Sequence, residues 1–267
     1  MISVLIRAGN DENIFECITS VKKTSPKSQI IISTIANSDL RERIANLKLE
    51  YCTVPRKNMS LTSNKGLELI KTNKVLITDS DTIFGKKCID LLAKALDTYS
   101  VVKPQLIFQN NGSLQSVLVA NLRAYFNSKK EKMFTPGLAF RMSIKNKIGG
   151  YYFDTKVTRA EDSEFSSRVE ANNLKTYVER KAKLFHTSIA MSHDLSGAFL
   201  TGAKKPETKT LMEIISKRIK TYTEIFNMFG FLTILYGLVW YLFFDFGKLS
   251  KHTGKIGRLI QNYFWKL

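Results

Sequence analysis

Two short acidic motifs contain the residues of this chain that are best suited to chemistry. The first is Asp79-Ser80-Asp81, which follows the apolar run Val75-Leu76-Ile77 directly. Two carboxylates one residue apart at the end of a strand can project into a crevice, where a hard divalent cation that bridges two phosphates needs oxygen ligands. Taken alone, the same pattern is also typical of a solvated turn or a helix cap.

The second motif is Glu161-Asp162, with Glu164 close behind, at the start of a predicted helix that follows Gly149-Gly150. Acidic residues in this position commonly do no more than cap a helix or interact with its dipole. The functional interpretation makes one of these carboxylates a general base, aimed at the hydroxyl group of an acceptor.

The elements that must position these motifs alternate between strand and helix patterns. This alternation predicts an α/β fold with a mostly parallel sheet. Ligands of such sheets bind outside the carboxyl ends of the strands, so the polar segments Ala8–Asp11, Thr34–Asp39 and Thr78–Asp81 are candidate binding segments. The predicted strands are Ile2–Ile6, Ile30–Ile35, Val75–Ile77 and Val101–Phe108, and the predicted helix faces are Ile14/Ile18/Val21 and Ile89/Leu92/Leu96.

Composition narrows the choice of partners. The chain has 267 residues, 44% of them hydrophobic, and a formal net charge of +18. This length suits one substantial domain with a short appendage, and the charge favours anionic partners such as a nucleotide diphosphate, acidic lipid or nucleic acid. Nucleic acid is not expected, because the lysines are dispersed and no known binding module is present. Three well-separated cysteines argue against a disulfide framework and a zinc knuckle.

The C-terminal part has a different composition. Residues Ile225 to Phe244 form a nearly uninterrupted apolar segment, about long enough to cross a bilayer. Residues 255–267 have the pattern of an amphipathic helix that lies in a membrane interface. Basic residues flank the apolar segment on both sides. A helix that crossed the membrane once would therefore place one basic cluster outside, against the usual preference of basic residues for the cytoplasmic side. Either the basic cluster before the segment sets the orientation of a crossing helix, or the segment lies in or re-enters the inner leaflet.

Together these segments resemble the family 2 glycosyltransferases, which have the GT-A fold, a mostly parallel central sheet with helices on both faces. The resemblance extends to about Lys205 and implies a catalytic domain at 1–205 followed by a membrane-associated helical tail at 206–267. Their order and spacing make the set more specific than any single motif. The matching segments are Val4–Asn10, Ser63–Leu67, Asp79–Asp81, Ala139–Arg141, Ile148–Tyr151 and Glu161-Asp162.

The resemblance implies a role for each candidate residue. Asp81 would bind a divalent cation, Mn²⁺ or Mg²⁺, and Asp79 would contact the ribose or the same metal. Asp162 would be the catalytic base, with Glu161 beside it on the acceptor side. His186 is a further candidate metal ligand, because many relatives place a histidine after the Glu-Asp segment. The nucleotide sugar would be bound by Ala8, Asn10, Asp39, Asn64, Asp79 and Ser80.

The sequence departs from the family pattern after the second predicted strand. Relatives usually have an acidic pair there, whereas in this chain only Asp39 matches the later acidic position. Thr34 stands where relatives usually have the residue that recognises the nucleotide base. The identity of the nucleotide therefore stays open.

The resulting expectation is an inverting, metal-dependent glycosyltransferase at the cytoplasmic face of a membrane, either membrane-associated or single-pass. It would move a sugar from a nucleotide-diphosphate sugar to a hydroxyl group of a membrane-linked glycan. One alternative is transfer to a polyprenyl phosphate, which is already ionised and needs no strong base. Another is a non-catalytic basic protein with a GT-A-like fold that binds a membrane or nucleic acid.

Overall fold

The computed structural model describes residues 1–35, 38–55, 58–128, 133–157, 160–204, 211–250 and 263. The chain forms two compact units, one of residues 1–107 and 129–187 and the other of residues 108–128 and 188–267. The functional division expected at residue 205 differs from this structural one and remains a prediction. The amphipathic helix expected at 255–267 lies, apart from Tyr263, outside the described residues.

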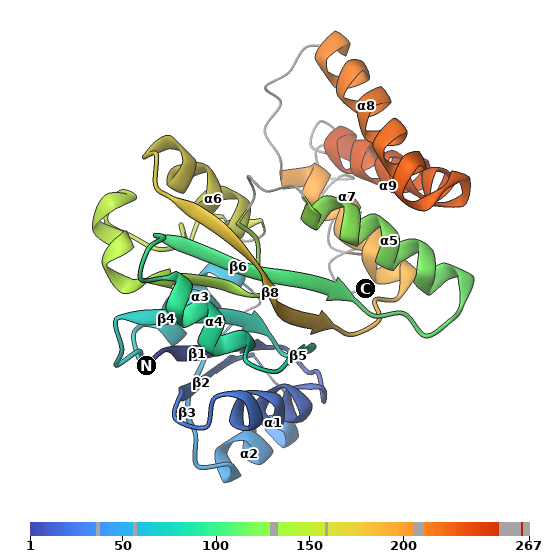
Figure 1. The fold of residues 1–267 in the computed structure, drawn as a ribbon. Coiled ribbons are helices and arrows are strands. Elements are labelled where there is room, and N and C mark those ends of the chain that lie inside the picture. The colour runs from blue at the N-terminus through green and yellow to red at the C-terminus, as the bar shows by residue number, and fades with distance from the viewer. Residues whose placement is uncertain are drawn as a thin grey trace. The chain divides into compact units, whose positions relative to one another are not determined.

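The first unit is built on a sheet with the strand order β3-β2-β1-β4-β7-β6-β8-β5 (Figure 1). One half is parallel and consists of β1 (Ser3–Ala8), β2 (Gln29–Thr34), β3 (Glu50–Thr53) and β4 (Lys74–Asp79). In the other half, β7 (Leu138–Arg141) runs antiparallel to both β4 and β6 (Val101–Phe108), and β5 (Thr82–Phe84) runs antiparallel to β8 (Thr176–His186).

The predicted α/β class is confirmed, and all four predicted strands are present as β1, β2, β4 and β6. The sheet is mixed, however, rather than mostly parallel. The difference arises at β7, which returns beside β4 as an antiparallel neighbour. This strand has only four residues and follows Pro136-Gly137, so its sequence carries too little periodicity to reveal it.

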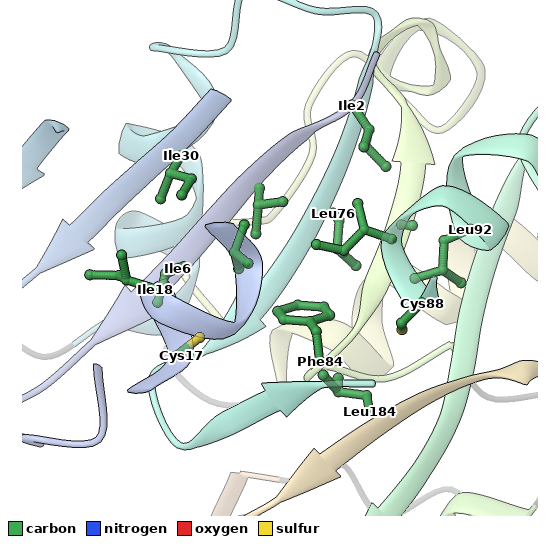
Figure 2. Packing of buried hydrophobic residues seen from close by; sticks show 14 of the residues in the cluster. Ile2, Ile6, Cys17, Ile18, Ile30, Leu76, Phe84, Cys88, Leu92 and Leu184 are labelled. Carbon is green, nitrogen blue, oxygen red and sulfur yellow. The ribbon is translucent and has the colours of Figure 1, made fainter. Parts of the chain in front are cut away.

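Helices cover both faces of the sheet because its central strands are apolar on both sides. Val4 and Ile6 of β1 join a core with α1 (Ile14–Thr24), α2 (Ser38–Asn46) and α4 (Cys88–Ala95). Figure 2 shows part of this core, with Phe84 of β5 and Leu184 of β8 among its members. Leu5 faces the opposite way, into a core with α3 (Met59–Leu67) and α6 (Glu161–Ala171). Side chains of β1 therefore alternate between two buried layers.

The second unit is helical and has a core of its own. It contains α5 (Leu114–Ser128), α7 (Met191–Lys204), α8 (Leu211–Phe229) and α9 (Phe231–Ser250). Leu122, Ala198, Ile225 and Tyr236 are among its buried residues. Of the helices described, only α9 has the length and composition needed to cross a membrane, with a mean hydropathy of 1.3.

Candidate active site

The turn between β4 and β5 carries the first acidic motif. Asp79 is the last residue of β4, and Thr82 is the first residue of β5. The backbone N–H of Ser80 donates a hydrogen bond of 3.0 Å to the carbonyl oxygen of Arg7, which ties the turn to β1. Since β1 and β4 are parallel neighbours, the motif lies at their carboxyl ends, where the sequence analysis expected it.

The end of β8 brings His186 to this turn. Antiparallel pairing sets His186 opposite Thr82, and the N–H of Thr187 donates to the carbonyl oxygen of Asp81 at 2.9 Å. Nε2 of His186 lies 3.4 Å from Oδ2 of Asp81. The structure thus brings together Asp81 and His186, two of the three residues predicted to bind metal.

A buried arginine joins the two acidic motifs. Arg7, which is 4% exposed, donates from Nε to Oδ1 of Asp79 at 2.8 Å. Its Nη1 donates to Oε1 of Glu161 at 2.6 Å, and its Nη2 donates to Oγ1 of Thr135 at 2.8 Å. One guanidinium therefore holds the end of β4, the start of α6 and the segment before β7 at one place.

Electrostatics keep this arginine charged. Burial opposes its positive charge, but the carboxylates of Asp79 and Glu161 outweigh burial and raise the pKa of Arg7. The buried Glu161 in turn has as its partner the guanidinium group of Arg7, which can form two hydrogen bonds to one carboxylate. Asp79 and Glu161 are thereby engaged within the protein.

Asp162 differs from its neighbour because neutral donors, not Arg7, hold it. Its Oδ2 accepts hydrogen bonds of 3.2 Å from both the N–H and the hydroxyl group of Thr135, and its Oδ1 accepts one of 2.7 Å from the N–H of Ser163. Burial and the charge of Glu161 together raise the pKa of Asp162 to about 7, despite an opposing effect of Arg7. Asp162 is only partly shielded from solvent. A carboxylate with these properties suits general-base chemistry near neutral pH.

Asp81 has the properties of a cation ligand. Its Oδ1 is one of three buried side-chain oxygen or nitrogen atoms in the described residues that lack a hydrogen-bond partner. Burial raises the pKa of Asp81 to about 6, and the carboxylates of Asp79 and Asp11 add to the rise while His186 opposes it. An unpaired buried carboxylate oxygen beside other acidic groups is costly without a positive partner.

The donor set fits a divalent cation, though incompletely. Nδ1 of His186 lies 2.9 Å from the carbonyl oxygen of Thr187, and a proton on Nδ1 leaves Nε2 as the acceptor that faces Asp81. Asp81 and His186 thus offer one oxygen and one nitrogen ligand. Within the described residues no group of three or more His, Cys, Asp or Glu side chains surrounds a common point, so substrate phosphates or water would complete the coordination.

The residues predicted to bind the nucleotide sugar lie in different settings. Ala8 ends β1 and is buried, Asn10 is exposed just beyond it, and the hydroxyl group of Ser80 donates to a carboxylate of Asp11 at 3.3 Å. Asn64 instead bonds both the carbonyl oxygen and the N–H of Phe153, which fixes the backbone of that segment. The side chain of Asp39 lies outside the described residues. Their nucleotide-binding role remains a prediction.

Sequence reasoning gave no individual role to four residues that complete the site. Arg7, Thr135 and Ser63 form the bridge between the acidic motifs, since Ser63 also accepts a bond of 3.3 Å from Arg7, and Asp11 faces Ser80. One signal was available: Arg7 is a charged residue directly after the predicted strand Ile2–Ile6, and the structure extends this strand to include it. Thr135 and Ser63 carry no comparable signal, because their positions depend on long-range packing.

The chain has a glycosyltransferase fold. Solved structures to which it is similar include those of TarS, a glycosyltransferase of S. aureus. Its match to residues 1–349 of TarS has a TM-score of 0.54 at 16% identity and covers 86% of this chain and 72% of that one. The matches to the complexes with UDP and UDP-GlcNAc have TM-scores of 0.54 and 0.55 at 15% and 17% identity, cover 95% of this chain, and cover 92% and 73% of the TarS chains.

A longer TarS chain is also similar, with a TM-score of 0.56 at 15% identity, but this protein covers only 44% of its length. No protein family model matches the chain, and no curated protein matches its sequence. Similarity at such low identity establishes the fold, so the chemistry has to be argued from the site itself.

Proposed function

We propose that this protein is a metal-dependent, inverting glycosyltransferase of the family 2 type. It transfers a sugar from a nucleotide-diphosphate sugar to a hydroxyl group of a membrane-linked glycan. The observation that carries this proposal is the bridge through Arg7, which bonds Asp79 and Glu161 and so joins the motif of the candidate cation ligand Asp81 to the motif of the candidate base Asp162. The fold shared with TarS, of which complexes with UDP and UDP-GlcNAc are known, supports a sugar nucleotide as the donor.

Asp162 acts as the general base in this mechanism. It takes the proton of the acceptor hydroxyl group, whose oxygen forms a bond to the anomeric carbon while the bond from that carbon to the diphosphate breaks. The raised pKa, about 7, lets Asp162 hold the proton that it accepts. No covalent enzyme intermediate is needed. A base of this kind favours a hydroxyl acceptor over a lipid phosphate, which is ionised before it arrives.

Asp81 and His186 would hold the cation, Mn²⁺ or Mg²⁺. Oδ1 of Asp79 is engaged by Arg7, which leaves Asp79 less available as a direct ligand than the sequence analysis expected. A bound cation supplies positive charge that stabilises the leaving diphosphate. Arg7 contributes by keeping Asp79 and Glu161 in place, so that neither carboxylate moves to neutralise the cation site.

The enzyme works at the cytoplasmic face of a membrane. Residues 1–205 provide catalysis, and residues 206–267 provide the membrane-associated tail. The apolar helix α9 and the net charge of +18 support this placement, because a basic protein is attracted to anionic lipid.

The test is thermal unfolding of the detergent-solubilised full chain with UDP, GDP and their sugar conjugates, each with Mn²⁺, Mg²⁺ or EDTA. A ligand that binds only the folded state raises the melting temperature. We expect a cation-dependent rise with one nucleotide series in the wild-type protein and no rise in Asp81→Asn. Asp90→Asn is the control, because Asp90 lies in the first turn of α4 and accepts a hydrogen bond from Ser25, which belongs to neither motif. Failure of every nucleotide to shift the wild-type protein would favour the non-catalytic alternative.

A further inference from the structure

Helix α9 has two faces of opposite character. Its buried face carries Thr233, Tyr236, Trp240, Phe244 and Gly247, which recur at helical spacing. The opposite face is apolar and exposed along the whole helix, with exposed fractions of 40% to 60%. This apolar stripe consists of Phe231, Leu232, Leu235, Leu238, Val239, Leu242, Phe246 and Leu249.

Polar and charged groups of neighbouring helices contact the buried face of α9. The hydroxyl group of Tyr236 donates to Oδ2 of Asp194 in α7 at 2.6 Å. Asp194 is itself fully buried and forms an ion pair with Arg123 of α5. Nearer the start of α9, Asn121 of α5 donates to the hydroxyl group of Thr233 at 3.3 Å.

The other end of α9 is fixed to α7 by direct backbone contact. A Cβ atom added at Gly247 would collide with the carbonyl oxygen of Phe199, and one added at Gly202 would collide with that of Phe244. Only glycine permits such an approach of two helices. Together with the contacts of Thr233 and Tyr236, these contacts hold α9 against α5 and α7 from one end to the other.

This packing conflicts with a simple crossing of the bilayer. A helix of 20 residues is about 30 Å long, which matches the hydrocarbon thickness. If α9 crossed, however, α5 and α7 would enter the hydrocarbon with it and bring Asp194 and Arg123, whose side chain is 30% exposed. Charged side chains at the bilayer centre are energetically costly and therefore rare. The apolar stripe itself, in contrast, contains no charged residue, and Asp245 of the same helix pairs with Arg218 of α8.

Charge indicates what covers the apolar stripe. The preceding helix α8 has exposed apolar residues, Ile219 and Phe226, on the same short segment as the exposed Lys217 and Lys220. Such a mixture of apolar and basic side chains suits the surface of an anionic membrane better than a second copy of a chain with a net charge of +18.

We propose that α9 lies within one leaflet of an anionic membrane, with the apolar stripe in lipid and α5 and α7 on the aqueous side, and that it does not cross the bilayer. This inference rests on the membrane association proposed above and specifies its topology. The chain after α9 then stays on the same side of the membrane as the catalytic unit.

Reporter fusions after Leu267 in a bacterial host test the topology. A green fluorescent protein fusion should fluoresce and an alkaline phosphatase fusion should be inactive, because both reporters remain in the cytoplasm. Active alkaline phosphatase at this position would overturn the proposal.

Flotation with phosphatidylglycerol-containing vesicles tests the surface itself. The double variant Leu235→Glu, Leu242→Glu should reduce the bound fraction on the order of tenfold or more, since two leucines leave lipid. Leu114→Glu is the matched control, because this exposed leucine belongs to α5, which covers the other face of α9. Unchanged vesicle binding in the double variant, or conversion of a dimer into monomers with binding intact, would overturn the proposal.

These outcomes are independent of sugar chemistry. The double variant should keep the nucleotide-dependent rise in melting temperature that the wild-type protein shows, and this rise also reports that it is folded. A protein that binds vesicles through α9 but binds no nucleotide would refute the proposed function alone. Nucleotide binding without stripe-dependent vesicle binding would refute the inference alone.

Discussion

The two acidic motifs are alike in composition but differ in what surrounds them. In each, one carboxylate pairs with Arg7, namely Asp79 after β4 and Glu161 at the start of α6. The second carboxylate of each has a raised pKa, about 6 for Asp81 and about 7 for Asp162. Asp81, however, has one oxygen that accepts no hydrogen bond from the residues that the structure describes, whereas both oxygens of Asp162 accept hydrogen bonds.

This difference explains how similar motifs can do different work. A carboxylate oxygen without a donor is available to a cation, while a carboxylate oriented by neutral donors is available to a proton. The shared arginine makes the contrast possible, because it satisfies one carboxylate of each motif. Changes at Arg7 should therefore affect both motifs, and changes elsewhere should affect one.

Arg7→Met should have the largest effect. It leaves Asp79 and Glu161 without their cation in a buried site, and breaking a buried pair in this way costs about 3–5 kcal/mol. Urea unfolding should show this loss. Adding Glu161→Gln to Arg7→Met should recover part of the stability, because one uncompensated charge disappears. Additive losses in the double variant would contradict the coupling.

Much of this arrangement could be anticipated from the sequence, but the bridge could not. Strand ends and helix starts follow from local patterns, which is why the two acidic motifs were identified as candidates. The family resemblance then implied the roles of Asp81, Asp162 and His186. Arg7 follows the predicted strand Ile2–Ile6 directly, yet its partners come from segments far along the chain. Thr135 is placed by the antiparallel return of β7, a strand too short to predict, and local periodicity contains no information about such pairing.

Asp162→Asn should separate the two motifs functionally. Turnover should fall on the order of 10²–10⁴-fold, because the base is lost while the cation site stays intact. The nucleotide-dependent rise in melting temperature should persist. Glu170→Gln, an exposed change on the same helix, should leave turnover unchanged. Retained turnover in Asp162→Asn would refute the assignment of the base.

The same variant gives a stability prediction. Because folding raises the pKa of Asp162 from 3.8 to about 7, the folded state binds this proton more tightly than the unfolded state. Stability should therefore fall as pH rises through that interval, and the neutral amide of Asp162→Asn removes this loss. The melting temperature of the variant should exceed that of the wild-type protein at pH 8. An equal or lower melting temperature would show that burial does not destabilise the ionised carboxylate of Asp162.

His186→Asn tests the other motif. The affinity for Mn²⁺ in the presence of the nucleotide should fall roughly 10–100-fold, since a nitrogen beside Asp81 is lost. Titration of the thermal shift with Mn²⁺ measures this change. His193→Asn provides the matched control, because His193 lies in α7 of the second unit. Equal losses in both variants would remove the case for His186 as a ligand.

The smallest expected effect concerns the hydroxyl group of Thr135, which accepts a hydrogen bond from Arg7 and donates one to Asp162. Thr135→Val removes a donor that stabilises the ionised carboxylate, so the pKa of Asp162 should rise by about 0.5–1 unit. Since the base works when deprotonated, the acid limb of the pH profile of kcat should move to higher pH by the same amount. Above about pH 8.5 both enzymes are deprotonated at Asp162, and their rates should converge. Thr135→Ser keeps the hydroxyl group and should keep the wild-type profile. Reduced turnover at every pH, without a shift of the acid limb, would instead mean that Thr135 only supports the local backbone, and the link between Arg7 and the base would be lost.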